Sequence, residues 1–307
     1  IMIYLSLGMQ NNTIPMANLR LAPIQLFLMA HPCTSRVETI DYAIITKEIA
    51  PTRPEFSERL VLVPNGTFSF TSRGHLTHEK AVKKLSESGS EKIIRIAIPS
   101  FAIKLTGRFI EMLRKIRQQS SRKVEFHFFP YLAGITYFHF KETMARQLPD
   151  SVVHTPYAYE KYLHVIGQCD FHMSPFPFGN TNGNIDSARM GLPIIAMDGE
   201  GIESRIDINM LQRMGMPEWT IARTADDYIA LAVSLIEDDE KRHALESLVK
   251  RIDLEKVFFS TGQEHVFVNT VDALYQQHEA LMASGAKVFD AGDLMAKLPA
   301  NAVAQAS

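Results

Sequence analysis

The chain has 307 residues, of which 46% are hydrophobic and 21% are charged, and its formal net charge at pH 7 is −2. This length is enough for roughly two domains, and the nearly neutral charge argues against nucleic acid or an acidic membrane as partner. No apolar run approaches the roughly 18 residues of a membrane span, so no span is expected. The two cysteines, Cys33 and Cys169, lack metal-ligand spacing, and a reducing, cytoplasmic setting is the simplest expectation.

The first part of the chain contains short apolar runs. They predict strands at residues 1–7, 39–46 and 60–64 and a short buried helix at residues 20–30. Residues 68–90 are polar and rich in Ser, Lys and Glu, and we expect them to form a linker between two domains.

From residue 92 onward, strand patterns alternate with helical ones. Strands are predicted at residues 93–98, 124–129, 151–154, 170–178 and 193–197, and helices at residues 106–119, 138–148, 157–167, 206–214, 225–237, 241–251 and 264–282. Such alternation predicts an α/β fold with a parallel sheet covered by helices on both faces. The Ala-rich residues 285–307 are expected to form a frayed tail.

The stretch at residues 174–191 reads S-P-F-P-F-G-N-T-N-G-N-I-D-S-A-R-M-G. It predicts a strand, a Gly/Asn/Thr turn and then a helix, an arrangement that directs backbone N–H groups at an anion. Asp186 would lie in the first helical turn, where it would complement the helix dipole or accept hydrogen bonds from ligand hydroxyls. The pattern favours a phosphate-bearing ligand, with an ordinary, well-capped strand–turn–helix junction as the alternative.

Three loops follow predicted strands, at residues 99–104, 154–157 and 179–186. A doubly wound sheet binds ligands at the carboxyl ends of its strands, so the three loops together indicate a ligand site. No G-x-G-x-x-G follows a strand and no Walker lysine motif is present, which disfavours a nicotinamide enzyme.

Several motifs in one order resemble the bacterial cytoplasmic N-glycosyltransferases, the adhesin-glycosylating enzymes of glycosyltransferase family 41 that are related to O-GlcNAc transferase. The motifs are R-L-A-P-I-Q (20–25), H-P-C-T-S with I-D-Y (31–42), H-T-P-Y (154–157), C-D-F-H-M-S-P-F (169–176), P-F-P-F-G-N-T-N-G (175–183), G-L-P (191–193) and R-M-G-M-P-E-W (213–219). The resemblance extends to about residue 282.

The resemblance implies a GT-B architecture. Residues 91–284 would form the complete C-terminal Rossmann-like domain, which holds the nucleotide sugar, and residues 1–90 the end of the N-terminal Rossmann-like domain with a linker. The family moves a hexose from a UDP donor to Asn in N-x-Ser/Thr sequons, with inversion and without a metal or other cofactor. The expected partners are a UDP-sugar and an acceptor protein or peptide. The rest of the N-terminal Rossmann-like domain would be supplied by further sequence or by a partner chain.

The resemblance also assigns site residues. Lys104 matches the lysine that meets the donor diphosphate, where a fixed cation would neutralise charge on the departing UDP. Asp186 matches the residue that grips the ribose hydroxyls, and His31 faces the cleft from the other half, where it would contact the donor sugar or orient the acceptor. The diphosphate loop comprises Gly179, Asn180, Thr181, Asn182 and Gly183, and the segment lining the uracil and phosphate pocket includes His154, Pro156 and Tyr157.

Three of these residues also have an ordinary interpretation: Lys104 as a solvated lysine at a helix start, His154 as a hydrogen-bonded structural histidine, and His31 as a loop-capping histidine. The sequence departs from the family at Phe101 and Ala102, which replace threonines, and at Tyr131 and Leu132, which replace polar residues. The donor sugar therefore stays open, and no general base is assigned. The alternative functions are a non-catalytic fragment that binds UDP-sugars and another GT-B enzyme such as a nucleotide-sugar epimerase, which fits the fold but not the motifs.

Overall fold

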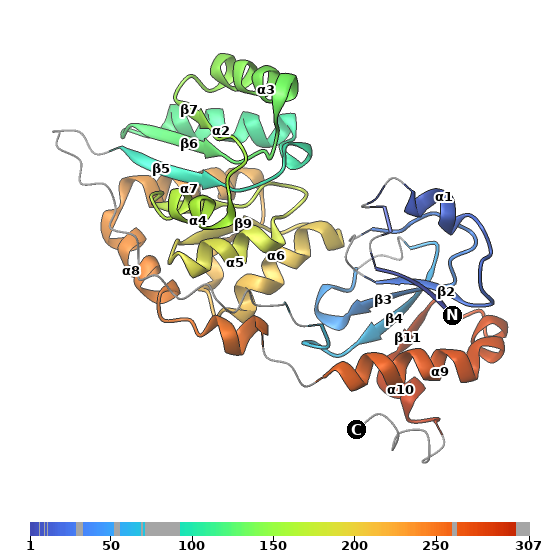
Figure 1. The fold of residues 1–307 in the computed structure, drawn as a ribbon. Coiled ribbons are helices and arrows are strands. Elements are labelled where there is room, and N and C mark those ends of the chain that lie inside the picture. The colour runs from blue at the N-terminus through green and yellow to red at the C-terminus, as the bar shows by residue number, and fades with distance from the viewer. Residues whose placement is uncertain are drawn as a thin grey trace. The chain divides into compact units, whose positions relative to one another are not determined.

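The computed structural model describes residues 1–5, 7–8, 10, 12–28, 33–51, 56–68, 70, 93–259 and 263–298. The chain divides into two compact units (Figure 1). The first contains residues 1–71, 200–202 and 258–307, and the second contains residues 72–199 and 203–257. The first unit is thus built from both ends of the sequence, and the second from its middle.

The first unit contains a five-stranded parallel sheet in the order β1-β2-β3-β4-β11. Its strands are β1 (Met2–Tyr4), β2 (Gln25–Leu28), β3 (Tyr42–Thr46), β4 (Arg59–Val63) and β11 (Val288–Asp290). Its helices are α1 (Thr13–Ala17), α9 (Glu264–Ala283) and α10 (Ala291–Met295).

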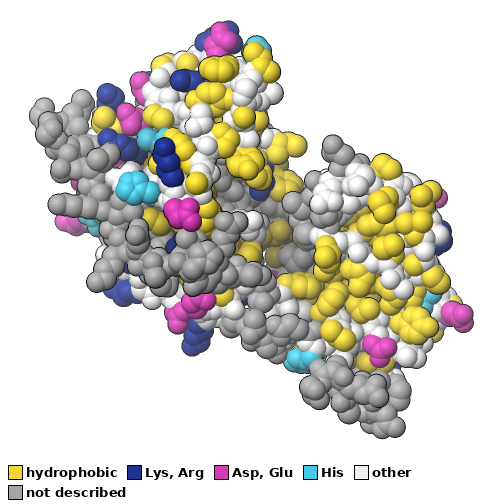
Figure 2. Space-filling view, in the orientation of Figure 1, with side chains coloured by type: hydrophobic (Ala, Val, Ile, Leu, Met, Phe, Trp, Pro, Cys, Tyr) yellow, Lys and Arg dark blue, Asp and Glu magenta, His cyan; other side chains and the backbone are white. Residues whose placement is uncertain are grey.

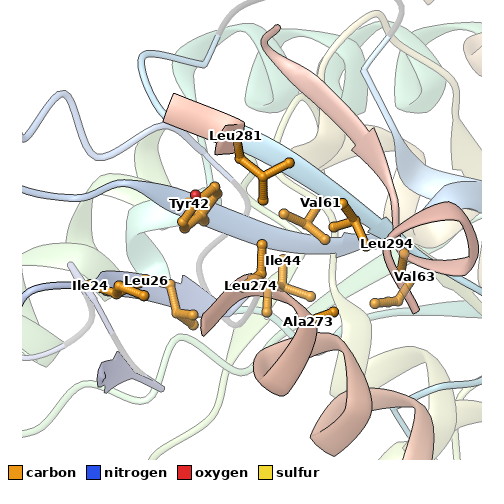
Figure 3. Close-up of a cluster of buried hydrophobic side chains, with 11 residues drawn as sticks. Ile24, Leu26, Tyr42, Ile44, Val61, Val63, Ala273, Leu274, Leu281 and Leu294 are labelled. Atoms are coloured by element: carbon orange, nitrogen blue, oxygen red, sulfur yellow. The ribbon is translucent and has the colours of Figure 1, made fainter. Parts of the chain in front are cut away.

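The core of this unit joins the sheet to the two helices from the end of the chain (Figure 3). Leu274 of α9 and Leu294 of α10 pack with Ile44 and Val61 of the central strands, and all four are nearly inaccessible to solvent. The Tyr42 hydroxyl lies 3.0 Å from Nδ1 of His278 on α9. Burial of these apolar side chains holds α9 and α10 on the first sheet.

Two expectations about the chain's organisation are therefore corrected. The helix at residues 264–282, expected in the second domain, belongs to the first unit, and the expected frayed tail contains β11 and α10 up to Met295. β11 extends the sheet by pairing with β4, a long-range contact that no local pattern encodes. Most of the expected linker, residues 71–90, lies outside the described residues.

The expected helix at residues 20–30 is also wrong, because Gln25–Leu28 forms strand β2. β2 pairs in parallel with β1 on one side and β3 on the other, and the backbone N–H of Gln25 donates to Asp41 at 2.8 Å. A short apolar run is ambiguous between helix and strand, and here pairing on both sides decides for the strand.

β1 lies at the edge of the first sheet in the described part of the chain. Figure 2 shows hydrophobic side chains gathered over this unit. The exposed large apolar residues in the first 21 positions of the chain are Ile1, Leu5, Ile14, Met16, Leu19 and Leu21. An open sheet edge favours pairing with another strand.

The second unit contains a six-stranded parallel sheet in the order β10-β9-β8-β5-β6-β7. When the strands of this sheet are numbered along the chain from 1 to 6, their order in space is 3-2-1-4-5-6, as in a Rossmann-type sheet. Strands 1 to 3 are added toward one edge of the sheet, and strand 4 lies on the other side of strand 1. The strands are β5 (Ile94–Ile98), β6 (Val124–Phe128), β7 (Ser151–Val153), β8 (Phe171–Met173), β9 (Ile194–Met197) and β10 (Ile221–Ala222). The switch point of the topology thus lies between β5 and β8.

Helices cover both faces of this sheet, with α4 and α5 on one face and α2 and α7 on the other (Figure 1). The helices are α2 (Gly107–Gln119), α3 (Gly134–Gln147), α4 (Tyr159–Ile166), α5 (Thr181–Arg189), α6 (Ile202–Arg213), α7 (Ala225–Glu237) and α8 (Asp239–Val249). Because both faces are covered, β5 reads as an almost continuous apolar run and its Ile94, Ile96 and Ile98 are fully buried. The expected α/β class with parallel sheets is confirmed.

Candidate functional site

The loop that leads from β8 into α5 is held by two neighbouring elements. The backbone N–H of Asn180 donates to both carboxylate oxygens of Asp207 on α6, at 2.9 and 2.8 Å. The Asn180 side-chain amide donates to the backbone oxygen of Pro99, directly after β5, at 2.6 Å. These bonds join the loops that follow β5 and β8, at the switch point where such sheets bind ligands.

Gly179 in this loop and Gly183 in the first turn of α5 permit the close packing. A Cβ atom on Gly179 would lie 2.4 Å from the Asp207 carboxylate. A Cβ atom on Gly183 would lie 2.2 Å from the amide nitrogen of Asn180 and 2.9 Å from the Pro99 oxygen. Any larger residue at either position would displace the bonds that hold the start of α5.

Lys104 ends the 3₁₀ turn η2 (Ala102–Lys104), which follows β5. Its Nζ donates to the backbone oxygen of Gly179 at 2.6 Å and lies 4.9 Å from the centre of the Phe178 ring. Burial lowers the pKa of Lys104, and the nearby charge of Asp207 raises it. An ammonium group has three N–H donors, so the bond to Gly179 leaves capacity for an anion.

Asp207 was not predicted as part of the site. Burial raises the pKa of its carboxyl, while hydrogen bonds from the Ser174 hydroxyl and the Asn180 backbone, together with the charge of Lys104, lower it. Asp207 occupies the buried stripe of α6 with Met210 and Leu211, and Met214, directly after the helix, is buried as well. An acidic residue at helical spacing with apolar ones was the signal in the sequence that could have revealed it.

The first turn of α5 contains Thr181, which is half-buried, and Asn182, which is exposed. The N–H groups of residues 181–183 lie where an α-helix provides no acceptor of its own. The positive end of the helix dipole lies at this turn, and the Lys104 ammonium lies beside Gly179. Together with the N–H groups, they provide the positive charge and the donors that an anion site needs.

Asp186 lies one turn further along α5 and faces α4. The hydroxyl of Tyr159 donates to its Oδ1. The ring of Tyr159 stacks on that of Tyr162 at 6.1 Å, and burial and the charge of Asp186 raise the pKa of Tyr162. Asp186 is thus half-buried and already hydrogen-bonded, and its contact with a ribose stays a prediction.

His154 follows β7 and belongs to a second group of polar residues. Its ring stacks on Phe129 at 4.4 Å, its Nε2 lies 3.1 Å from Nδ1 of His127, and its Nδ1 lies 3.2 Å from the Tyr157 hydroxyl. Burial lowers the pKa of His154 to about 4. Pro156, which lies between His154 and Tyr157 in the sequence, is exposed.

The structure therefore brings together Lys104, Gly179, Asn180 and Gly183 at the start of α5, and it pairs His154 with Tyr157 after β7. His31 lies outside the described residues. Among the residues that the structure describes, no group of three or more His, Cys, Asp or Glu side chains could hold a metal ion. No helix within those residues is long and apolar enough to cross a membrane.

Comparison with known proteins gives similarities of sequence and of fold. The chain is 36% identical over 239 residues to a UDP-glucose:protein N-beta-glucosyltransferase of Actinobacillus pleuropneumoniae serotype 5b, a match that covers 77% of this chain and 38% of the relative. It is 23% identical over 252 residues to a probable UDP-N-acetylglucosamine–peptide N-acetylglucosaminyltransferase SPINDLY of Eustoma exaltatum, covering 78% of this chain and 26% of that protein. No family model matches the chain.

Among solved structures, a Thermobaculum terrenum O-GlcNAc transferase mutant matches with a TM-score of 0.65 at 16% identity, over 90% of this chain and 52% of that one. This match confirms the expected GT-B type of the α/β fold. The partial coverage fits the expectation that the chain corresponds to a C-terminal portion of its relatives. The sequence match confirms the expected resemblance to the UDP-glucose:protein N-beta-glucosyltransferases of glycosyltransferase family 41, and the chain spans less than half of the length of the Actinobacillus relative.

Proposed function

We propose that the chain binds a UDP-sugar at the carboxyl ends of β5 and β8 and serves as the donor-binding part of a protein glycosyltransferase. The observation that carries this proposal is the position of the Lys104 ammonium, 2.6 Å from the Gly179 oxygen at the entrance to α5. A cation and the free N–H groups of a helix start would together hold a diphosphate. The relatives supply the substrate class, because their names state UDP-sugars and protein or peptide acceptors.

In this proposal, Lys104, Thr181 and Asn182 bind the diphosphate, and the fixed charge of Lys104 stabilises the departing UDP without a metal ion. Asp186 would accept hydrogen bonds from the ribose, for which the Tyr159 hydroxyl must move aside or share the carboxylate. His154, Pro156 and Tyr157 would line the uracil site. The transfer would place a hexose on Asn of an N-x-Ser/Thr sequon with inversion at the anomeric carbon, and His31 would contact the donor sugar or the acceptor.

The transfer itself is tested by incubating the chain with UDP-glucose and a peptide that contains one Asn-x-Thr sequon, and measuring the peptide's mass. The proposal expects the mass of one hexose to be added, and a control peptide with Gln in place of Asn to stay unchanged. Tight binding of UDP-glucose without transfer would instead identify the chain as a non-catalytic donor-binding fragment.

The ribose contact is tested by a pair of variants that act on the same hydrogen bond. Asp186→Ala removes both the carboxylate and its bond to Tyr159, whereas Tyr159→Phe removes that bond and leaves the carboxylate in place. If Asp186 binds the ribose, the first variant weakens UDP binding and the second does not. Equal loss in both variants would mean that Asp186 acts only by holding α4 on α5.

A further inference from the structure

A row of polar side chains lies on one face of the second sheet, beneath the His154 loop. Glu125 and His127 are two residues apart on β6, so their side chains point to the same face, while Val124, Phe126 and Phe128 point to the other and are buried. The register pairs Arg95 of β5 with Glu125, and the Arg95 Nε lies 3.5 Å from the Glu125 Oε2.

These side chains form a continuous line of hydrogen bonds from the sheet to the loop. The Glu125 Oε2 lies 3.4 Å from Nε2 of His127, and Nδ1 of His127 lies 3.1 Å from Nε2 of His154. Nδ1 of His154 lies 3.2 Å from the Tyr157 hydroxyl. Both ring nitrogens of each histidine are therefore engaged.

The direction of every bond in the line follows from its first member. An ionised carboxylate only accepts hydrogen bonds, so the His127 proton must be on Nε2, and its Nδ1 must accept. The His154 proton must then be on Nε2, which leaves a lone pair on Nδ1 that accepts from the Tyr157 hydroxyl. This reasoning requires neutral imidazoles, and burial lowers the pKa of both histidines.

We infer that Glu125 and His127 are positioning residues that fix the tautomer of His154 and turn the Tyr157 proton toward the sheet. The Tyr157 oxygen then offers only lone pairs to a ligand. It selects a group that donates a hydrogen bond, as the imide N–H of a uracil base does. This inference rests on the proposed function for the identity of the ligand, but the tautomer itself does not depend on any ligand.

The test reads the tautomer first, in the chain without nucleotide. Two-bond ¹H–¹⁵N correlation spectra of the histidine rings distinguish a protonated Nε2 from a protonated Nδ1, and His154→Asn assigns the His154 signals. Wild type is expected to show His154 protonated on Nε2. Glu125→Ala is expected to mix the two tautomers, and Glu125→Gln, whose amide oxygen can accept the same bond, to restore the Nε2 form.

The second part measures UDP affinity by calorimetry. Glu125→Ala and Tyr157→Phe are each expected to weaken binding roughly 2- to 12-fold, the range for one neutral hydrogen bond, with Glu125→Gln close to wild type. A His154 protonated on Nδ1 in wild type, or one that does not respond to Glu125→Ala, would overturn the inference. Failure of wild type to bind UDP would overturn the proposed function and the uracil assignment, while the spectra would still judge the positioning role.

Discussion

The carboxylate of Asp207 accepts the backbone N–H of Asn180 through both of its oxygens, at 2.9 and 2.8 Å, from within the core of the second unit. A buried carboxylate is costly unless it is hydrogen-bonded, and the Ser174 hydroxyl and the Lys104 charge offset the rest of that cost. This carboxylate therefore fixes where α5 begins, and with it the direction of the N–H groups proposed to meet the diphosphate.

Asp207→Asn tests this role. An asparagine presents an NH₂ group where an acceptor is needed, so we expect the free energy of unfolding to fall by about 1.5–3 kcal/mol, the range for hydrogen bonds to charged groups. Urea denaturation of the variant measures this change. Glu279→Gln, at an exposed position, is the control and should leave stability within about 0.5 kcal/mol of wild type. A loss in Asp207→Asn no larger than in the control would contradict the role of Asp207.

Gly179→Ala should also be destabilising, because the added Cβ would lie 2.4 Å from the Asp207 carboxylate and the backbone would have to shift. Overpacking of this kind costs about 1–3 kcal/mol, and UDP affinity should fall with it. Gly107→Ala is the matched control, since nothing lies within 4 Å of its Cβ position at the start of α2. Thermal unfolding of both variants compares their stability. A Gly179→Ala protein as stable as Gly107→Ala would contradict the close packing of Gly179 against Asp207.

His172 of β8 should make stability depend on pH. Burial lowers its pKa to about 3, and neither ring nitrogen has a hydrogen-bond partner among the described residues. The unfolded chain binds a proton near pH 6.5 that the folded chain does not bind until about pH 3, so stability must fall as pH decreases below 6.5. The expected contribution is roughly 1.4 kcal/mol per pH unit.

Urea denaturation between pH 7 and pH 5 measures this slope. His172→Phe should make it shallower by about that amount, while His139→Phe, on the exposed surface of α3, should leave it unchanged. The pH dependence of stability that remains in His172→Phe comes in part from His127 and His154, because burial also lowers their pKa values. An unchanged slope in His172→Phe would show that His172 takes up its proton over the same pH range in the folded and the unfolded chain, and would contradict the lowered pKa.

Leu274→Ala tests whether the last long helix stabilises the first unit. Leu274 is fully buried between α9 and the first sheet, and truncation of such a side chain costs about 2–5 kcal/mol. The next residue, Tyr275, is 63% exposed and serves as the control. Thermal unfolding should separate Leu274→Ala clearly from Tyr275→Ala, and similar stability in the two would mean that α9 does not contribute to this core.

The sequence predicted elements well where local signals agree. The helix expected at residues 225–237 is α7, with the same bounds, because Thr224 and Asp227 form a capping box ahead of an apolar helical pattern. The placement of α9 and β11 could not be predicted in this way. It depends on contacts with strands more than 200 residues earlier in the chain, and a local pattern does not show which of two sheets a helix will cover.

The candidate site shows the same limit. The Gly179–Asn180 turn was predictable because its residue types are specific to a strand–turn–helix junction that can face an anion. Asp207, Glu125 and His127 were not predicted, because their importance lies in the neighbours that the sheet and α6 bring to them. In the sequence they are single polar residues within regular elements, and most residues of that kind simply face solvent.

The measurement that tests the proposed donor site most directly is calorimetric titration of UDP into wild type, Lys104→Ala and Lys115→Ala. Lys115 lies on the exposed side of α2 and controls for the loss of one positive charge. We predict that wild type and Lys115→Ala bind UDP alike and that Lys104→Ala binds it roughly 10- to 150-fold more weakly, as expected for the loss of a hydrogen bond between charged groups. Binding by Lys104→Ala that equals wild type, or no binding by a folded wild-type chain, would contradict a diphosphate site at the start of α5.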